Sequence, residues 1–171
     1  MSNGDKNRDD FEHLWWPADD LFTGAWWVKN QLEESELSRA ERDDPEGVRE
    51  ICEGVADVLD KWKPDVECET TNEFIFDLAD YLKENIEWDV EIQPDTPHGL
   101  PSILLGDKLV LELKVNPDKG ERGRVAGQCA DYSKQWVAWV VFVGANASII
   151  GQFSTLLTDK GLRRILVWHF S

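Results

Sequence analysis

Residues 109–115 read LVLELKV, in which apolar side chains at alternate positions frame Glu112 and Lys114. The side chains of a β-strand point alternately to its two faces. Glu112 and Lys114 are therefore expected to share one face, while the apolar residues at 109, 111, 113 and 115 share the other. This pattern predicts a strand with one face in a core and one face that can carry chemistry.

The second half of the chain continues as a series of helix-period and strand-period segments. In order, they predict a helix over 72–85, a strand over 88–93, paired strands over 102–105 and 108–115, a helix over 121–134 and a strand over 136–143. Gly106 and Asp107 are typical of the tip of a tight hairpin. The run 137–143 predicts a central strand buried on both faces, and 164–170 predicts a final strand. The predicted fold class is α/β.

The first half is expected to be mainly helical. Pro17 followed by two aspartates is typical of a helix start, and helical spacing continues to Leu32. A second amphipathic helix is predicted over 45–62, with a loop or frayed end over 33–44. Tryptophan pairs at 15–16 and 26–27 are expected to pack these helices on the core or on a second subunit; stacking on bases is the alternative. We expect a disordered tail (1–12), an acidic tryptophan-rich helical extension packed on the core (13–68) and the core itself (69–171).

The predicted core resembles the PD-(D/E)XK nuclease superfamily, which has the restriction-endonuclease-like fold. Glu112 and Lys114 match its (D/E)XK element, and Gln128 and Tyr132 match the QxxxY element of its RecB-like branch. The predicted order of elements matches its αβββαβ core with a mixed central sheet, here carrying an N-terminal helical extension. In that superfamily the acids hold Mg²⁺ or Mn²⁺ and the lysine orients or activates the attacking water. Oxygen ligands suit these hard cations, which neutralise charge developing on the phosphate.

One position departs from the superfamily pattern. Ser102 follows Pro101, where the superfamily has its first aspartate. A serine is a poor substitute for a metal-binding carboxylate. Asp95 could supply the missing oxygen from the preceding loop, and so could Asp107 from the hairpin tip, where it is less well placed. Asp95 is the preferred metal ligand, and a turn aspartate beside two prolines is the alternative.

The resemblance also gives roles to residues on the two core helices. Glu73 would be an auxiliary acid and metal ligand, although Thr70-x-x-Glu73 also has the pattern of a helix capping box. Gln128 and Tyr132 lie four residues apart and so face the same way on a helix, one turn after Arg124.

These helix positions would serve the site in two ways. Gln128 and Tyr132 would order the site, while Arg124, Lys119 and Arg122 would meet a phosphate. The alternative for the helix is a solvated face with a partly buried tyrosine. The alternative for Glu112 and Lys114 is a surface ion pair.

Charge divides the chain into two unequal halves. Residues 1–100 hold 28 acidic and 9 basic side chains, a net charge of −19, whereas residues 101–171 hold 6 and 9, a net charge of +3. The half that carries the motif is therefore the basic one, as phosphate binding requires. An acidic half suits a halophilic cytoplasm, where a Debye length of about 3 Å at 1 M salt screens repulsion from DNA. A basic protein partner for the acidic half and mimicry of nucleic acid are the alternatives.

These observations lead to two functional expectations. The first is a Mg²⁺- or Mn²⁺-dependent deoxyribonuclease acting on single- or double-stranded DNA, with a homodimer as one arrangement, because endonucleases of this class often pair. The second is a catalytically decayed nuclease-like module that binds a protein through its acidic helical half. No basic and apolar leader follows Met1, so we expect a cytoplasmic protein. The uncharged run 136–158 is interrupted by glycines and polar residues, so we expect no membrane span. Zinc and disulfides are not expected from three scattered cysteines.

Overall fold

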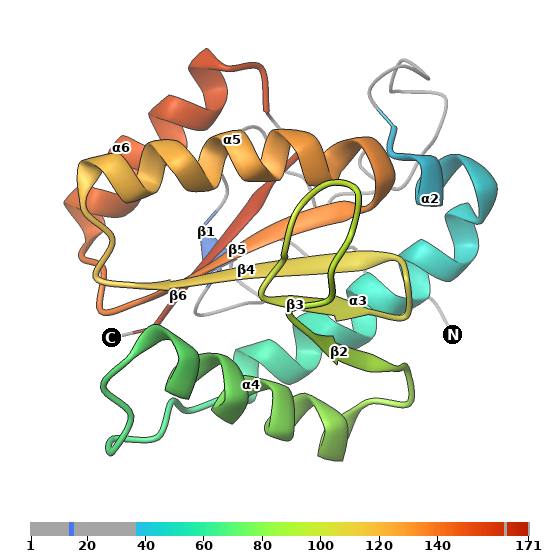
Figure 1. The fold of residues 1–171 in the computed structure, drawn as a ribbon, viewed down its shortest axis with the longest axis horizontal. Coiled ribbons are helices and arrows are strands. Elements are labelled where there is room, and N and C mark those ends of the chain that lie inside the picture. Colours follow the sequence, from blue (N-terminus) through green and yellow to red (C-terminus); the bar gives the residue numbers. More distant parts are fainter. Residues whose placement is uncertain (1–13, 16–36, 163, 171) are drawn as a thin grey trace.

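The computed structural model of the chain describes residues 14–15, 37–162 and 164–170. Within them, a mixed β-sheet lies between two layers of helices (Figure 1). The described elements, in chain order, are β1 (Leu14–Trp15), α2 (Arg39–Asp43), α3 (Pro45–Lys61), α4 (Thr71–Asn85), β2 (Val90–Ile92), β3 (Ile103–Leu105), β4 (Leu109–Val115), α5 (Lys119–Gln135), β5 (Val137–Val143), α6 (Ala147–Asp159) and β6 (Leu166–Phe170). The α/β class predicted from the sequence is confirmed.

The described strands form one six-stranded sheet with the order β1-β6-β5-β4-β3-β2. β2, β3 and β4 form an antiparallel meander, and β4, β5 and β6 run parallel to one another. The predicted hairpin tip is confirmed, because Gly106 and Asp107 both have positive φ, 56° and 55°. Such values suit a two-residue turn between antiparallel strands. The predicted succession of helix, three strands, helix and strand is found as α4-β2-β3-β4-α5-β5.

The sheet separates two hydrophobic cores. α3 and α4 pack on one face against the odd-numbered residues of β4, and α5 and α6 pack on the other face, where Val110 is buried (Figure 1). The alternation read from the sequence is therefore correct, since Leu109, Leu111 and Leu113 lie in the first core, away from Glu112. β5 is buried along its whole length, as predicted for a central strand.

The segment before α3 differs from the sequence prediction. The expected loop over 33–44 is wrong for residues 39–43, which form α2. Ser38 caps this helix: its hydroxyl accepts from the Glu41 N–H, and the Glu41 carboxylate accepts from the Ser38 N–H. This reciprocal pair satisfies two backbone donors that a helix start leaves open. α3 then begins as predicted, with Pro45 in its first turn and Asp44 as its cap.

Several expectations concern residues that lie outside the described part of the chain. They are the disordered tail over 1–12, the helix that begins at Pro17 and the tryptophan pair at 26–27. Of the first tryptophan pair, Trp15 is described, and Leu14–Trp15 forms a short antiparallel strand beside β6 that the sequence did not predict. None of the helices in the described part is both long and apolar enough to cross a membrane.

Candidate functional site

Ser102 and Glu112 face each other where β3 pairs with β4. The register sets Ile103 opposite Leu111, and Ser102 with Glu112 is the next pair along. The Ser102 hydroxyl donates a hydrogen bond to Glu112 Oε1 at 2.8 Å and accepts one from the Leu113 N–H at 3.0 Å. Each of the two residues is only 3% exposed. At the place where the resemblance expects an aspartate, the chain therefore has a buried hydrogen-bond donor to the glutamate.

Burial governs the electrostatics of Glu112. Removal from water raises the pKa of the Glu112 carboxyl group, and interactions with Ser102, Lys114 and Tyr132 lower it in part. Only one carboxylate oxygen is satisfied, because Oε2 is buried without a hydrogen-bond partner in the described part of the chain. Glu112 therefore keeps a proton to higher pH than an exposed glutamate, and it has one free oxygen inside the protein.

Tyr132 and Cys129 complete the surroundings of Glu112 from the side of α5. Both side chains are fully buried. Burial, and then the Glu112 carboxylate, raise the pKa of the Tyr132 hydroxyl and of the Cys129 thiol. The Tyr132 hydroxyl interacts electrostatically with Glu112, and among the described residues it has no hydrogen-bond partner of standard geometry. Two unpaired buried oxygens, Glu112 Oε2 and Tyr132 Oη, thus belong to the same group.

The remaining predicted residues of α5 lie outside this buried group. The buried stripe of the helix is Val125, Ala126, Cys129 and Tyr132, whereas Gln128 is exposed. Gln128 and Tyr132 are therefore not equivalent members of one face: the tyrosine points into the core and the glutamine lies beyond its edge. The alternative of a partly buried tyrosine is also wrong, because Tyr132 is 0% exposed.

The basic residues predicted to meet a phosphate have different surroundings. Arg124 and Lys119 are exposed. The Arg122 guanidinium instead donates to the Pro117 C=O at 2.9 Å and to Gln152 Oε1 at 3.0 Å, which joins the start of α5 to α6. Arg124 and Lys119 are thus more available to a ligand than Arg122. Lys114, on β4, is half-buried.

The three further acids considered from the sequence are not gathered around Glu112. Asp95 is exposed in the loop between β2 and β3. Asp107 Oδ1 accepts from Trp136 Nε1 at 3.0 Å, so the hairpin-tip aspartate has a structural partner. Glu73 is a capping residue, since its carboxylate accepts from the N–H groups of Glu69 at 2.6 Å and Thr70 at 3.2 Å. These bonds lower the pKa of Glu73.

The start of α4, which carries Glu73, nevertheless lies near the same end of the sheet. Gln93 Nε2 donates to Asn72 Oδ1 at 3.3 Å, and the Gln93 N–H donates to the Ser102 C=O at 3.0 Å. A continuous path of contacts therefore runs from the first turn of α4 through Gln93 and Ser102 to Glu112.

The oxygen donors at Glu112 fit a divalent cation only in part. The unpaired Glu112 Oε2 is a hard oxygen ligand of the kind that Mg²⁺ and Mn²⁺ prefer. Among the described residues, however, no group of three or more His, Cys, Asp or Glu side chains is arranged to hold a metal. The chemistry of Glu112 fits a cation, and a second carboxylate would have to be brought to it.

Comparisons with protein-family models, with curated proteins and with solved structures find no match for this chain. No relative therefore supplies a function or a ligand set. The chemistry of the chain must be inferred from its own side chains, above all from Glu112, Ser102, Lys114 and Tyr132.

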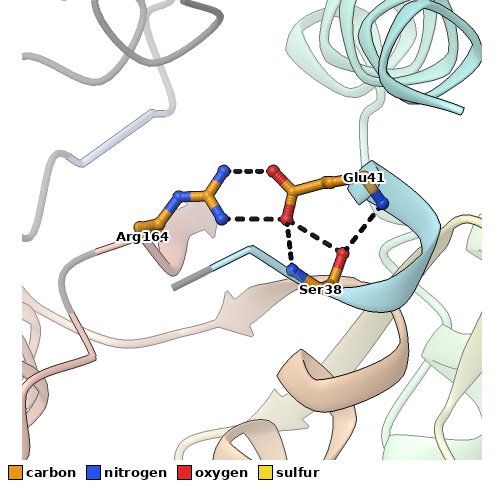
Figure 2. Close-up of polar contacts among 3 residues, drawn as sticks. All are labelled: Ser38, Glu41 and Arg164. Carbon is orange, nitrogen blue, oxygen red and sulfur yellow. Dashed lines mark hydrogen bonds and ion pairs between the residues drawn. The ribbon is translucent and has the colours of Figure 1, made fainter. Parts of the chain in front are cut away.

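A second charged group, far from Glu112 in sequence, escaped the sequence analysis. Figure 2 shows the Arg164 guanidinium aligned with the Glu41 carboxylate, with the Ser38 hydroxyl and N–H on Glu41 Oε1. Arg164 Nη1 donates to Glu41 Oε1 at 2.8 Å, and Nη2 donates to Oε2. The side chains of Arg164 and Glu41 are only 17% and 10% exposed.

The pair of Arg164 and Glu41 joins α2 to the segment before β6, and a cavity of about 40 Å³ lies beside it. The capping pattern Ser38-x-x-Glu41 was the sequence signal for half of this group.

An acidic hollow of about 870 Å³ lies along β2 and the hairpin tip. Its lining includes four carboxylates, from Glu87, Asp89, Glu91 and Asp107. Carboxylates repel the phosphates of nucleic acid. This surface is therefore unsuited to DNA, and its charge would suit a basic partner.

Proposed function

We propose that this chain is a nuclease of the PD-(D/E)XK type that hydrolyses phosphodiester bonds of DNA, with Glu112 and Lys114 at its centre. The observation that carries the proposal is the position of these two side chains on one face of β4, with Tyr132 of α5 beside Glu112. They lie within the succession α4-β2-β3-β4-α5-β5. Burying a glutamate with one unpaired oxygen lowers the stability of the fold, and proteins tend to have such groups at functional sites.

Each residue of the proposed site has a chemical task. Glu112 Oε2 would hold Mg²⁺ or Mn²⁺, with Asp95 as the second carboxylate and Glu73 as an auxiliary acid. The bound cation would lower the pKa of a water molecule and neutralise charge developing on the phosphate. The Lys114 ammonium would orient the water or phosphate by hydrogen bonding, with Gln128 and Tyr132 ordering the site. Arg124 and Lys119, both exposed, would meet phosphates of the DNA backbone, with Arg122 as a weaker candidate.

The raised pKa of Glu112 gives this proposal a pH signature. A cation must displace the proton that burial keeps on the carboxyl group. Metal binding and cleavage should therefore strengthen as the pH rises through the pKa of Glu112. An exposed carboxylate site would already be ionised at lower pH.

The test is cleavage of end-labelled single- and double-stranded DNA with Mg²⁺, with Mn²⁺ and with chelator, at low and at molar salt. Glu112→Gln and Lys114→Met should each reduce metal-dependent cleavage by about 100-fold or more. Glu91→Gln is the matched control: it removes an exposed carboxylate from β2, two strands away from β4, and should leave cleavage unchanged. Parental cleavage by Glu112→Gln would refute the proposal.

The second candidate is a catalytically decayed nuclease-like module that binds a basic protein partner. The hydrogen bond from Ser102 to Glu112 favours it, because a hydroxyl takes an oxygen that a metal site would use. The acidic hollow along β2 provides a surface of the required charge. If the parent chain is inert and Ser102→Asp cuts DNA, the decayed module is supported. If the parent cuts and Asp95→Asn does not, the active nuclease with a displaced ligand is supported.

A further inference from the structure

Glu112 and Tyr132 are closed off from solvent. Glu112 is 3% exposed and Tyr132 is 0% exposed, yet each has a buried oxygen without a hydrogen-bond partner. A site that admits a cation and a phosphate must be open to both. The described structure is therefore a closed form of the site, and part of the chain must move before a ligand can reach Glu112.

The loop between β2 and β3 lies over Tyr132 and Trp136, at the end of α5 that is next to Glu112. It reaches from the sheet across to α5 in Figure 1. A β-carbon built on Gly99 would lie 3.6 Å from the Tyr132 hydroxyl oxygen and 3.7 Å from its ring, so Gly99 faces that hydroxyl with room for about one methyl group between them. The His98 ring meets the Trp136 ring edge-on, with 5.7 Å between the centroids and 81° between the planes.

The tip of this loop is held together by hydrogen bonds within it, so it can move as one body. Thr96 and Gly99 exchange two backbone hydrogen bonds of 3.1 Å, and the Thr96 hydroxyl donates to the Gly99 C=O at 2.7 Å. The Thr96 hydroxyl also accepts from the His98 N–H at 3.1 Å. The hydrogen bonds found for the tip thus stay within it, while its contacts with Tyr132 and Trp136 are ring and van der Waals contacts. Such contacts can break without leaving a buried polar group unpaired.

The loop also has a defined end where a hinge can act. β-pairing continues as far as the Gln93 N–H, which donates to the Ser102 C=O at 3.0 Å. Gln93 itself has φ of 46°, a backbone conformation that a non-glycine residue adopts rarely, and Pro94 follows it. The bend at Gln93 sets the direction of the loop, and rotation there would carry the tip away from α5.

We propose that residues 94–101 form a lid that closes the Glu112 site and is held shut by His98 on Trp136 and Gly99 on Tyr132. The inference deepens the proposed function and rests on it for the ligand that enters, a hydrated divalent cation with a DNA phosphate. Asp95 lies on this lid, so opening and closing change its position relative to Glu112. The lid thus governs access to the site, and because Asp95 is exposed in the closed form, its approach to Glu112 would require the lid to move.

The lid can be tested without any cleavage assay, because the chain has only two tyrosines. Tyr132 lies beneath the lid, and half-buried Tyr81 on α4 serves as the internal reference. The full chain is treated with tetranitromethane, and nitration at each tyrosine is followed by mass spectrometry. In parallel, a thiol reagent labels Cys52, a fully buried residue of α3 on the opposite face of the sheet, which reports global unfolding.

His98→Ala removes the ring that holds the lid shut. The rate of Tyr132 nitration should rise about 2- to 10-fold, because this is the change in population that the loss of one edge-on ring pair produces. His98→Phe keeps that ring contact and should retain the parental rate. Leu100→Ala, in the exposed part of the same loop, is the matched control and should also leave the rate unchanged. Labelling of Cys52 should be the same in all four proteins.

Two results would overturn the lid. One is an unchanged ratio of Tyr132 to Tyr81 nitration in His98→Ala, and the other is nitration of Tyr132 that never runs ahead of Cys52 labelling. Failure of the nuclease proposal looks different, since a chain that cuts no DNA but shows the His98-dependent nitration keeps the lid and loses only the proposed reaction.

Discussion

The hydrogen bond between Ser102 and Glu112 makes a quantitative prediction about stability and pH. Ser102→Ala removes the donor to Glu112 Oε1 and the acceptor of the Leu113 N–H, both in a buried place. A buried N–H left unpaired costs about 1–3 kcal/mol. That part of the cost does not depend on pH, because a backbone amide does not titrate.

The part that involves Glu112 does depend on pH. A hydrogen bond to a neutral partner contributes about 0.5–1.5 kcal/mol and one to a charged group about 1.5–3 kcal/mol. Glu112 is protonated at low pH and ionised above its raised pKa. Ser102→Ala should therefore reduce the free energy of unfolding by about 1 kcal/mol more at about pH 9 than at about pH 4.

The sign follows from the number of protons that each state binds. Because the folded pKa of Glu112 lies above the unfolded value near 4.5, the folded chain binds more protons between these two pKa values. The contribution of Glu112 protonation to the free energy of unfolding is complete below the unfolded pKa, and it falls as the pH rises toward the folded pKa. Ser102→Ala raises the folded pKa further, so this decline should become larger in the variant.

The assay is urea unfolding of the parent and Ser102→Ala at both pH values, repeated in a Glu112→Gln background. In that background the cost of Ser102→Ala should no longer depend on pH, because residue 112 cannot ionise. Equal costs at the two pH values in the parent background, or a cost below about 0.5 kcal/mol at either, would refute the proposed coupling.

Two further predictions concern the polar groups outside the site. Arg164→Met should lower the free energy of unfolding by about 3–5 kcal/mol, because it leaves the Glu41 charge buried without its partner. The matched change Arg39→Met breaks an exposed i,i+4 pair and should cost about 0.5 kcal/mol or less in the same denaturation assay. Thr70→Ala should cost about 1 kcal/mol by removing the N-cap of α4; a Thr70→Ala protein as stable as the parent would contradict the capping role of Thr70 and Glu73.

Features set by local sequence were predicted well. The alternation around Glu112, the capping box at Thr70 and the Gly106-Asp107 turn each depend on residues within a few positions of one another, and the structure contains all three. Where the sequence prediction failed, at α2, a local signal was present but outweighed: the charged run 33–44 was interpreted as solvated chain, although Ser38-x-x-Glu41 has the capping pattern.

Features that depend on distant parts of the chain could not be predicted in the same way. The pairing of Glu41 with Arg164 joins residues 123 positions apart, and no local pattern specifies it. The contact of His98 with Trp136 depends on where the β2–β3 loop folds over α5. Tyr132 was expected on a helix face, but its complete burial follows from the packing of that helix on the sheet.

The division of the interior by the sheet has a consequence for how this protein can evolve. Among the described residues, the core beneath α3 and α4 contains 24 buried apolar side chains, and the core beneath α5 and α6, which adjoins Glu112, contains 16. Substitutions that share no contacts have nearly additive effects on stability. A mutation near Glu112 therefore changes the free energy of unfolding by its own cost and leaves the packing of the larger core unchanged. A chain built in this way can acquire, alter or lose a reaction on one side of its sheet while natural selection preserves the architecture on the other.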